Sequence, residues 1–108
     1  MSAFSYLDTV VATIAEREGG DPKTSYAAKL LKKGVKRIAK KVGEEAVEVA
    51  IAAVARGREE TIDESADLLF HLMLLWRSTG IAPSEVMDEL KRREAISGIA
   101  EKQARIEE

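Results

Sequence analysis

The segment from about Glu59 to Thr79 constrains the fold more than any other part of the chain. Its apolar residues point in nearly every direction around a helical wheel, and no strand-like alternation appears in it. A helix that is apolar all round must be buried on several sides. A chain of 108 residues buries too little surface to provide that cover alone. We therefore predict an all-α fold that is completed by dimerisation, as a homodimer.

Glycine, proline and serine divide the rest of the chain into further helices. A first amphipathic helix is expected to end at Gly19, and Ser25 suits the N-cap of a short helix that stops at Gly34. A longer helix covers about 35–56, and Pro83 suits the first turn of a last one. The predicted fold is a four- to five-helix bundle, a single domain over residues 1–108. Within it we expect an N-terminal helix, a core and a polar tail, over residues 1–20, about 25–95 and 96–108.

Composition and charge exclude several classes of protein. The chain has no cysteine, so disulfides and thiolate zinc sites are excluded. Its N-terminal stretch does not resemble a signal peptide, and its longest nearly apolar run is too short to span a membrane. The formal net charge of −2 argues against general nucleic-acid binding. We expect a cytoplasmic protein with neither a membrane nor a nucleic acid as its partner.

Two acidic groups lie at equal distances from the expected turn at Gly57. Each stands roughly 10–15 Å from that turn at 1.5 Å per residue, so antiparallel packing would bring the groups face to face. Carboxylates that converge in a partly buried space repel each other unless a cation is present, and hard oxygen ligands suit Mg²⁺ or Mn²⁺. The residues concerned are Glu44, Glu45, Glu48, Glu64 and Asp67.

A simpler interpretation of these acids stays open. Glu44 and Glu45 could form ordinary i, i+4 ion pairs with Lys40 and Lys41, and such surface pairs are common and weak. For His71, which continues the acidic stripe of its helix, a hydrogen-bonded histidine in the core or at an interface is the favoured alternative to a site residue.

A basic run precedes the acids. Between Lys23 and Gly43 there are eight basic residues and no acidic one. Several of them crowd the first turns of a helix, where the helix dipole makes positive charge unfavourable. A bound polyphosphate would compensate for this charge and bridge to the metal cluster. A merely solvated basic face is the alternative.

Three segments in order resemble a known enzyme family. Residues 44–48 and 64–67 match the EExxE…ExxD pattern of the all-α nucleotide pyrophosphohydrolases of MazG type. More specifically, residues 25–30, 40–45 and 66–71 are similar to the phosphoribosyl-ATP pyrophosphohydrolase family of histidine biosynthesis. The resemblance spans about Ser25 to Arg93. Phe70 departs from it, since a tyrosine is expected before the histidine.

The resemblance implies hydrolysis of 1-(5-phospho-β-D-ribosyl)-ATP to the corresponding AMP derivative and pyrophosphate. We assign Mg²⁺, with Mn²⁺ as a possible substitute, to Glu45, Glu48, Glu64 and Asp67. The candidates for catalytic base or water positioning are Glu44 and Glu45. The candidates for phosphate contact are Lys29, Lys33, Arg37, Lys40 and Lys41. Nearer the base or sugars of the substrate we place Ser25, Tyr26 and His71.

Two other functions remain as alternatives. A house-cleaning nucleoside triphosphate pyrophosphatase would use the same metal chemistry with a different substrate pocket, and a panel of dNTPs separates it from the first prediction. A non-enzymatic helical interaction module would use its apolar helices for a protein partner. Absence of Mg²⁺ binding would favour that module.

Overall fold

The computed structural model describes residues 6–95, 102 and 105–106. Within this part of the chain the secondary structure is helical, and there is no strand. The predicted all-α class is confirmed. Most of the predicted polar tail lies outside the described residues. The elements are α1 (Tyr6–Arg17), α2 (Tyr26–Lys33), α3 (Val35–Ile51), the π turn η2 (Ala52–Arg56), α4 (Arg58–Thr79) and α5 (Pro83–Ala95).

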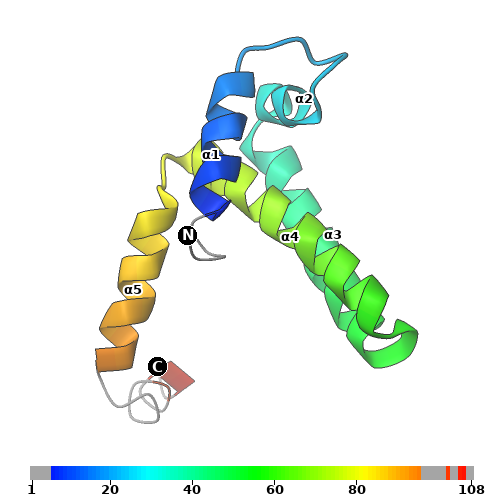
Figure 1. The fold of residues 1–108 in the computed structure, drawn as a ribbon, viewed down its shortest axis with the longest axis vertical. Coiled ribbons are helices and arrows are strands. Elements are labelled where there is room, and N and C mark those ends of the chain that lie inside the picture. The colour runs from blue at the N-terminus through cyan, green and yellow to red at the C-terminus, as the bar shows by residue number, and fades with distance from the viewer. Residues whose placement is uncertain (1–5, 96–101, 103–104, 107–108) are drawn as a thin grey trace.

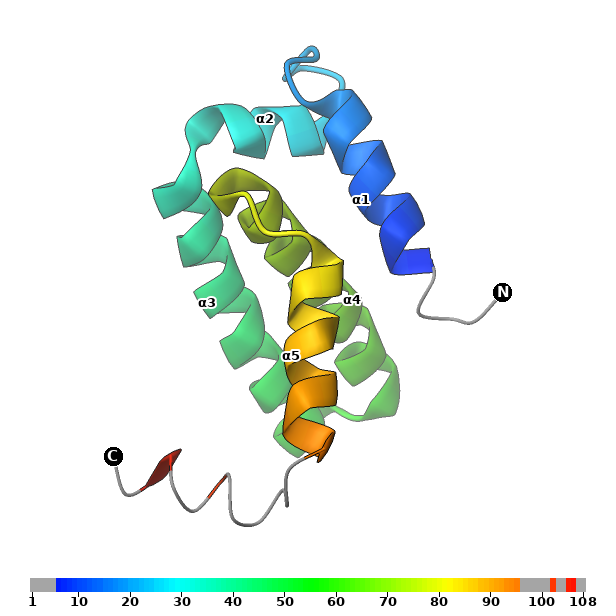
Figure 2. The same cartoon turned by 90° about the vertical axis from the view of Figure 1, so that its left-hand side faces the viewer.

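The short helix α2 begins and ends where its sequence predicts. Ser25 is the N-cap: its Oγ accepts a hydrogen bond from the backbone N–H of Ala28 at 3.1 Å. This bond satisfies one of the amide groups that the first turn of a helix leaves free. Gly34 ends the helix with φ at +95°, a value that side chains with a Cβ rarely adopt. Together these two residues set the ends of α2, which lies across one end of α3 and α4 (Figure 2).

The helices α3 and α4 form an antiparallel hairpin (Figure 1). The sequence predicts one helix through residue 56, and the structure agrees except that the last five residues form the π turn η2. Its closing bond runs from the Gly57 N–H to the carbonyl of Ala52, at 2.9 Å. Gly57 then reverses the chain at φ +112°, and α4 begins at the next residue.

The core lies where α1 and α2 cover the N-terminal part of α3 and the C-terminal part of α4. Ile38 and Leu74 are fully buried there, and the other buried members of the cluster are Ile14, Ala27, Leu30 and Met73. These contacts hold α2 and its basic residues against the end of the hairpin. No helix in the described part of the chain is long and apolar enough to cross a membrane.

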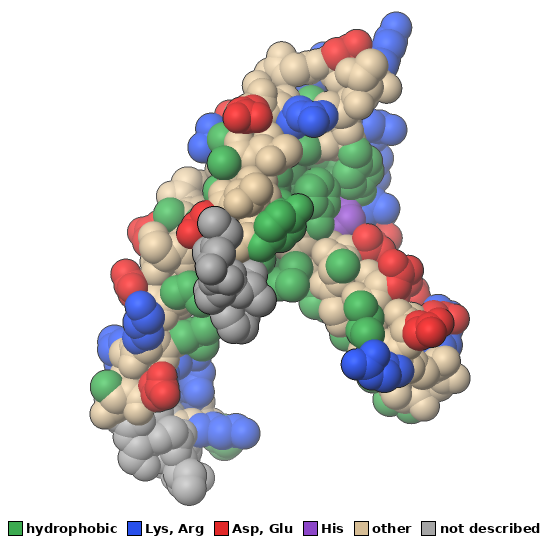
Figure 3. All heavy atoms as spheres, in the orientation of Figure 1, with side chains coloured by type: hydrophobic (Ala, Val, Ile, Leu, Met, Phe, Trp, Pro, Cys, Tyr) green, Lys and Arg blue, Asp and Glu red, His purple; other side chains and the backbone are tan. Residues whose placement is uncertain are grey.

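The hairpin leaves apolar side chains uncovered. Val54 is 89% exposed and Ile62 55%, and Val47 and Leu69 are also exposed. Helix α5 stands away from α3 and α4 (Figure 1), and apolar side chains line the sides that face each other across the gap (Figure 3). The radius of gyration, 16.0 Å, exceeds the about 13 Å expected for a compact domain of this length.

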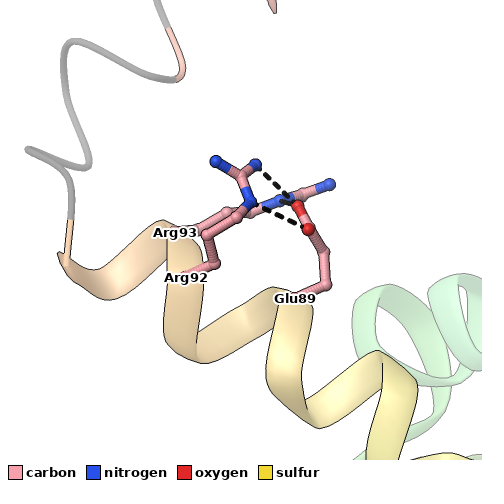
Figure 4. Close-up of polar contacts among 3 residues, drawn as sticks. All are labelled: Glu89, Arg92 and Arg93. Carbon is pink, nitrogen blue, oxygen red and sulfur yellow. Dashed lines mark hydrogen bonds and ion pairs between the residues drawn. The ribbon is translucent and has the colours of Figure 1, made fainter.

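An ion-pair network on α5 strengthens this isolated helix. Glu89 accepts hydrogen bonds from Arg92 at 2.7 and 2.9 Å and from Arg93 at 3.0 Å (Figure 4). The hydrogen bonds from Arg92, and then the hydrogen bond from Arg93, lower the pKa of Glu89 to about 2. Pairs at i, i+3 and i, i+4 spacing stabilise a helix that has few tertiary contacts.

Candidate functional site

Three carboxylates meet between α3 and α4. One carboxylate oxygen from each of Glu45, Glu64 and Asp67 lies within 4.8 Å of the others. Glu45 comes from α3 and the other two come from successive turns of α4, so the antiparallel hairpin brings these three of the five predicted acids to the same level. Glu45 and Glu64 are half-buried, and Asp67 is exposed. We call these three residues the carboxylate cluster.

The electrostatics of the carboxylate cluster favour a bound cation. Burial is the largest cause that raises the pKa of Glu64, followed by its hydrogen bond with Glu45 and by the charges of Glu45, Asp67 and Glu48. None of the three clustered carboxylates forms an ion pair with Lys or Arg among the described residues. The donor set is therefore all oxygen, and no described Lys or Arg side chain pairs with it. Such a set fits Mg²⁺ or Mn²⁺.

Two of the predicted acidic residues lie outside the carboxylate cluster. Glu48 is half-exposed, and its Oε2 lies 3.5 Å from Nη1 of Arg56. The same Nη1 lies 3.7 Å from Oε2 of Glu60. Glu44 is exposed on α3. Their assignments, Glu48 to the metal and Glu44 to catalysis, stay predictions.

A basic cavity lies at the junction of α2 and α3. It has a volume of about 270 Å³ and is lined by Tyr26, Lys29, Leu30, Lys33, Arg37 and Lys41. The four basic residues are spaced four apart along the chain, so each helix directs two of them to one side. The nearby charge of Lys29 is the largest cause that lowers the pKa of Lys33, followed by burial and by the charges of Arg37 and Lys41. The cavity thus concentrates positive charge.

The remaining phosphate and substrate candidates are not all in this basic cavity. Lys40 is exposed and does not line it, and Ser25 is buried as the N-cap of α2. A neighbouring hollow of about 640 Å³ shares Lys29 and Lys33 and adds Lys23 and Lys32. These two lysines belong to the basic run, but helical spacing alone did not single them out as site residues.

Tyr26 and His71 connect the basic cavity to the carboxylate cluster. His71 is 5% exposed, and its Nδ1 lies 2.7 Å from the backbone carbonyl of Asp67. A carbonyl only accepts, so Nδ1 carries the hydrogen. In the tautomer protonated on Nδ1 alone, Nε2 accepts a hydrogen bond from the hydroxyl of Tyr26 at 2.7 Å. The ring of Tyr26 also stacks on Phe70. Figure 3 shows the histidine between the basic and the acidic side chains.

Replacing Tyr26 by phenylalanine should destabilise the protein by about 1 kcal/mol, because Nε2 of the buried His71 loses its donor. Urea unfolding followed by circular dichroism measures the change. Tyr6→Phe is the matched control, since Tyr6 is exposed and its hydroxyl forms no hydrogen bond within the described chain. Equal stability of the two variants would contradict the proposed role of the Tyr26 hydroxyl.

Comparisons with known proteins agree on one family. The family model for phosphoribosyl-ATP pyrophosphohydrolase matches residues 7–94. A phosphoribosyl-ATP pyrophosphatase from Azospirillum brasilense is 54% identical over 99 residues, which cover 92% of this chain and 89% of that protein. Proteins of the same name from Novosphingobium aromaticivorans and Dinoroseobacter shibae are 56% and 50% identical, over 92% and 94% of this chain and 92% and 99% of theirs. The chain therefore belongs to the phosphoribosyl-ATP pyrophosphohydrolase family.

Proposed function

We propose that this protein hydrolyses 1-(5-phospho-β-D-ribosyl)-ATP to 1-(5-phospho-β-D-ribosyl)-AMP and pyrophosphate, the second step of histidine biosynthesis. Family membership supports this activity. The observation that carries it in the structure is the carboxylate cluster beside the basic cavity, connected through Tyr26 and His71. A polyphosphate needs both parts, since its cleavage requires charge neutralisation and a positioned water. A cytoplasmic location remains the prediction made from the sequence.

The metal proposed for the site is Mg²⁺, with Mn²⁺ as a substitute. Glu45, Glu64 and Asp67 would hold it, and Glu48 completes the predicted ligand set. When bound, the ion neutralises charge on the phosphoryl oxygens. Glu44 and Glu45 are the candidates to orient the attacking water and take up its proton. Glu44 suits that role because it is exposed and adjoins the cluster in sequence.

The basic residues are proposed to bind and orient the polyphosphate. Lys29, Lys33, Arg37 and Lys41 line one cavity, so several charge-assisted hydrogen bonds can act on one phosphate chain. Lys40 lies outside the cavity and is therefore a less central candidate for phosphate contact. The position of Tyr26 in the cavity lining supports its predicted contact with the base or sugars. His71 is buried, and its contact with the substrate stays a prediction.

A phosphorus NMR assay tests the proposed reaction. The purified protein is incubated with phosphoribosyl-ATP and Mg²⁺, and a parallel sample contains a chelator instead. Pyrophosphate and the AMP derivative should form in equal amounts, and only with the metal. Release of orthophosphate, or equal turnover with the chelator, would overturn the proposal.

We further propose that the second copy of this chain covers the apolar faces of α3 and α4. The exposed side chains Val47, Val54, Ile62 and Leu69 support this, because a monomer rarely leaves so many apolar residues uncovered along one hairpin. The gap between α5 and the hairpin is open in the space-filling view, and apolar side chains face it (Figure 3). A homodimer is the simplest closed assembly for such a surface.

Sedimentation equilibrium at micromolar concentration should report twice the chain mass of 11.8 kDa. Ile62→Lys should shift the protein toward the monomer by at least about tenfold in dissociation constant, because burying an unpaired charge in an interface is costly. A wild-type protein that sediments only at 11.8 kDa would refute the dimer.

A further inference from the structure

We propose that Arg56 holds Glu48 outside the carboxylate cluster until a divalent cation binds, and so sets the affinity of the site for that cation. Arg56 is then a positioning residue that competes with the metal for one of its ligands. This inference rests on the proposed metal function of the cluster.

Glu48 contacts Arg56 and lies outside the carboxylate cluster. Glu48 belongs to the predicted ligand set, yet only the other three members share a position within 4.8 Å. Its Oε2 instead lies 3.5 Å from Nη1 of Arg56, and both side chains are about half exposed, at 42% and 47%. Glu48 lies three residues after Glu45 on α3, so the two side chains project from the same face of that helix. Glu48 can therefore pair either with the guanidinium of Arg56 or with the proposed metal ion.

The π turn η2 brings Arg56 toward the face of α3 that carries Glu48. Arg56 lies eight positions after Glu48, and in a continuous α-helix the two side chains would point about 80° apart at 100° per residue. The wider turn η2 delays the rotation of the chain, because its bond spans five residues instead of four. Arg56 thereby returns toward the face of Glu48. The same position lets it reach Glu60 on α4, at 3.7 Å.

The size of the effect follows from the exposure of the pair. One carboxylate oxygen cannot serve both a guanidinium and a metal ion fully, so the metal must displace Arg56 from Glu48. Exposed ion pairs of this kind are weak, so the displacement should weaken the apparent metal affinity by only about two- to fivefold. Glu60 remains as a partner for the released guanidinium, which keeps that loss small.

Isothermal titration calorimetry with Mn²⁺ tests the inference on the wild-type chain and its variants. Arg56→Gln should bind Mn²⁺ about two- to fivefold more tightly than the wild type. Arg58→Gln is the matched control, because it removes the same charge near the same turn from a side chain with no ion pair among the described residues. In a Glu48→Gln background, Arg56→Gln should have no further effect, since the two residues act on one contact.

NMR of the arginine side chains gives a second readout on the unmodified protein. The Nε–H signal of Arg56, assigned by its loss in Arg56→Gln, should shift during a Mg²⁺ titration with the dissociation constant found by calorimetry. The Arg58 signal should not move. This measurement decides the matter even if Glu48→Gln binds metal too weakly to titrate.

The outcomes separate this inference from the proposed metal site. If the wild type binds neither Mn²⁺ nor Mg²⁺, the metal proposal fails and this inference with it. If the wild type binds and Arg56→Gln is unchanged or weaker, only the inference fails. It also fails if Arg58→Gln gives the same gain, if the gain persists without Glu48, or if the Arg56 signal does not shift.

Discussion

Replacing Glu64 by glutamine is expected to lower pyrophosphate release from phosphoribosyl-ATP at least about 100-fold. Loss of a partner that only orients a metal ligand costs 10–100-fold, and Glu64 is itself placed in the ligand set. Glutamine keeps the size of the side chain and its capacity to hydrogen bond with Glu45. The loss should therefore appear in turnover at saturating Mg²⁺ without a change in helical content by circular dichroism.

Glu59→Gln is the control for this variant. Glu59 also lies on α4, is exposed and takes no part in the carboxylate cluster. The substitution removes the same charge and should keep activity close to that of the wild type. If Glu64→Gln retains near-wild-type turnover, or if both variants lose activity equally, the assignment of the cluster is wrong.

The same Glu64→Gln variant should gain stability in the absence of metal. The pKa of Glu64 is raised in the fold, so the native state binds more protons than the unfolded chain between the unfolded and folded pKa values. The free energy of unfolding contributed by this group then falls as pH rises through that window, and the penalty is complete above the folded pKa. With a chelator present, the variant should melt above the wild type at neutral pH, and the difference should vanish below the unfolded pKa. A constant difference at all pH values would contradict this account.

Replacing Arg37 by glutamine is expected to lower kcat/KM for phosphoribosyl-ATP by about 10- to 100-fold, the size expected for one hydrogen bond to a charged group. Arg37 lies four residues after Lys33 and four before Lys41, and all three line the basic cavity. Its guanidinium can hold two phosphate oxygens at once, which a lysine cannot. Steady-state kinetics at fixed ionic strength measures the change.

Lys36→Gln is the matched control for Arg37. Lys36 precedes it on the same helix and is exposed, and it does not line the basic cavity. Its loss should change kcat/KM less than about twofold at moderate salt, where exposed charges are screened. Equal losses of kcat/KM in the two variants would indicate that the basic run acts only through its overall positive charge, without a defined phosphate site.

The helix boundaries and the convergence of the three clustered carboxylates can be predicted from local patterns in the sequence. Ser25 and Gly34 bound α2 because one supplies an oxygen for a free amide and the other adopts a positive φ. Glu45, Glu64 and Asp67 meet because a fixed rise per residue on both sides of Gly57 puts them at one level. These features need only spacing and an antiparallel turn.

Other parts of the site depend on contacts that spacing does not determine. The π turn depends on how the end of α3 closes onto Gly57, and the residues of η2 give no local signal for it. Without that turn, the pairing of Glu48 with Arg56 cannot be predicted. The bond from Tyr26 to His71 joins residues 45 positions apart, so it requires the packing of α2 on α4. From the sequence both residues are predicted to lie near the substrate, but no local pattern predicts the bond between them.

The measurement that tests the central claim most directly is a comparison of substrates under one set of conditions. Pyrophosphate release is followed with phosphoribosyl-ATP and with each of the four dNTPs, at equal concentration and saturating Mg²⁺. The account predicts that kcat/KM for phosphoribosyl-ATP exceeds that for every dNTP by at least about 100-fold, because recognition of the second ribose phosphate adds charged hydrogen bonds. Turnover of dNTPs at an equal or higher kcat/KM would contradict it and favour a house-cleaning pyrophosphatase.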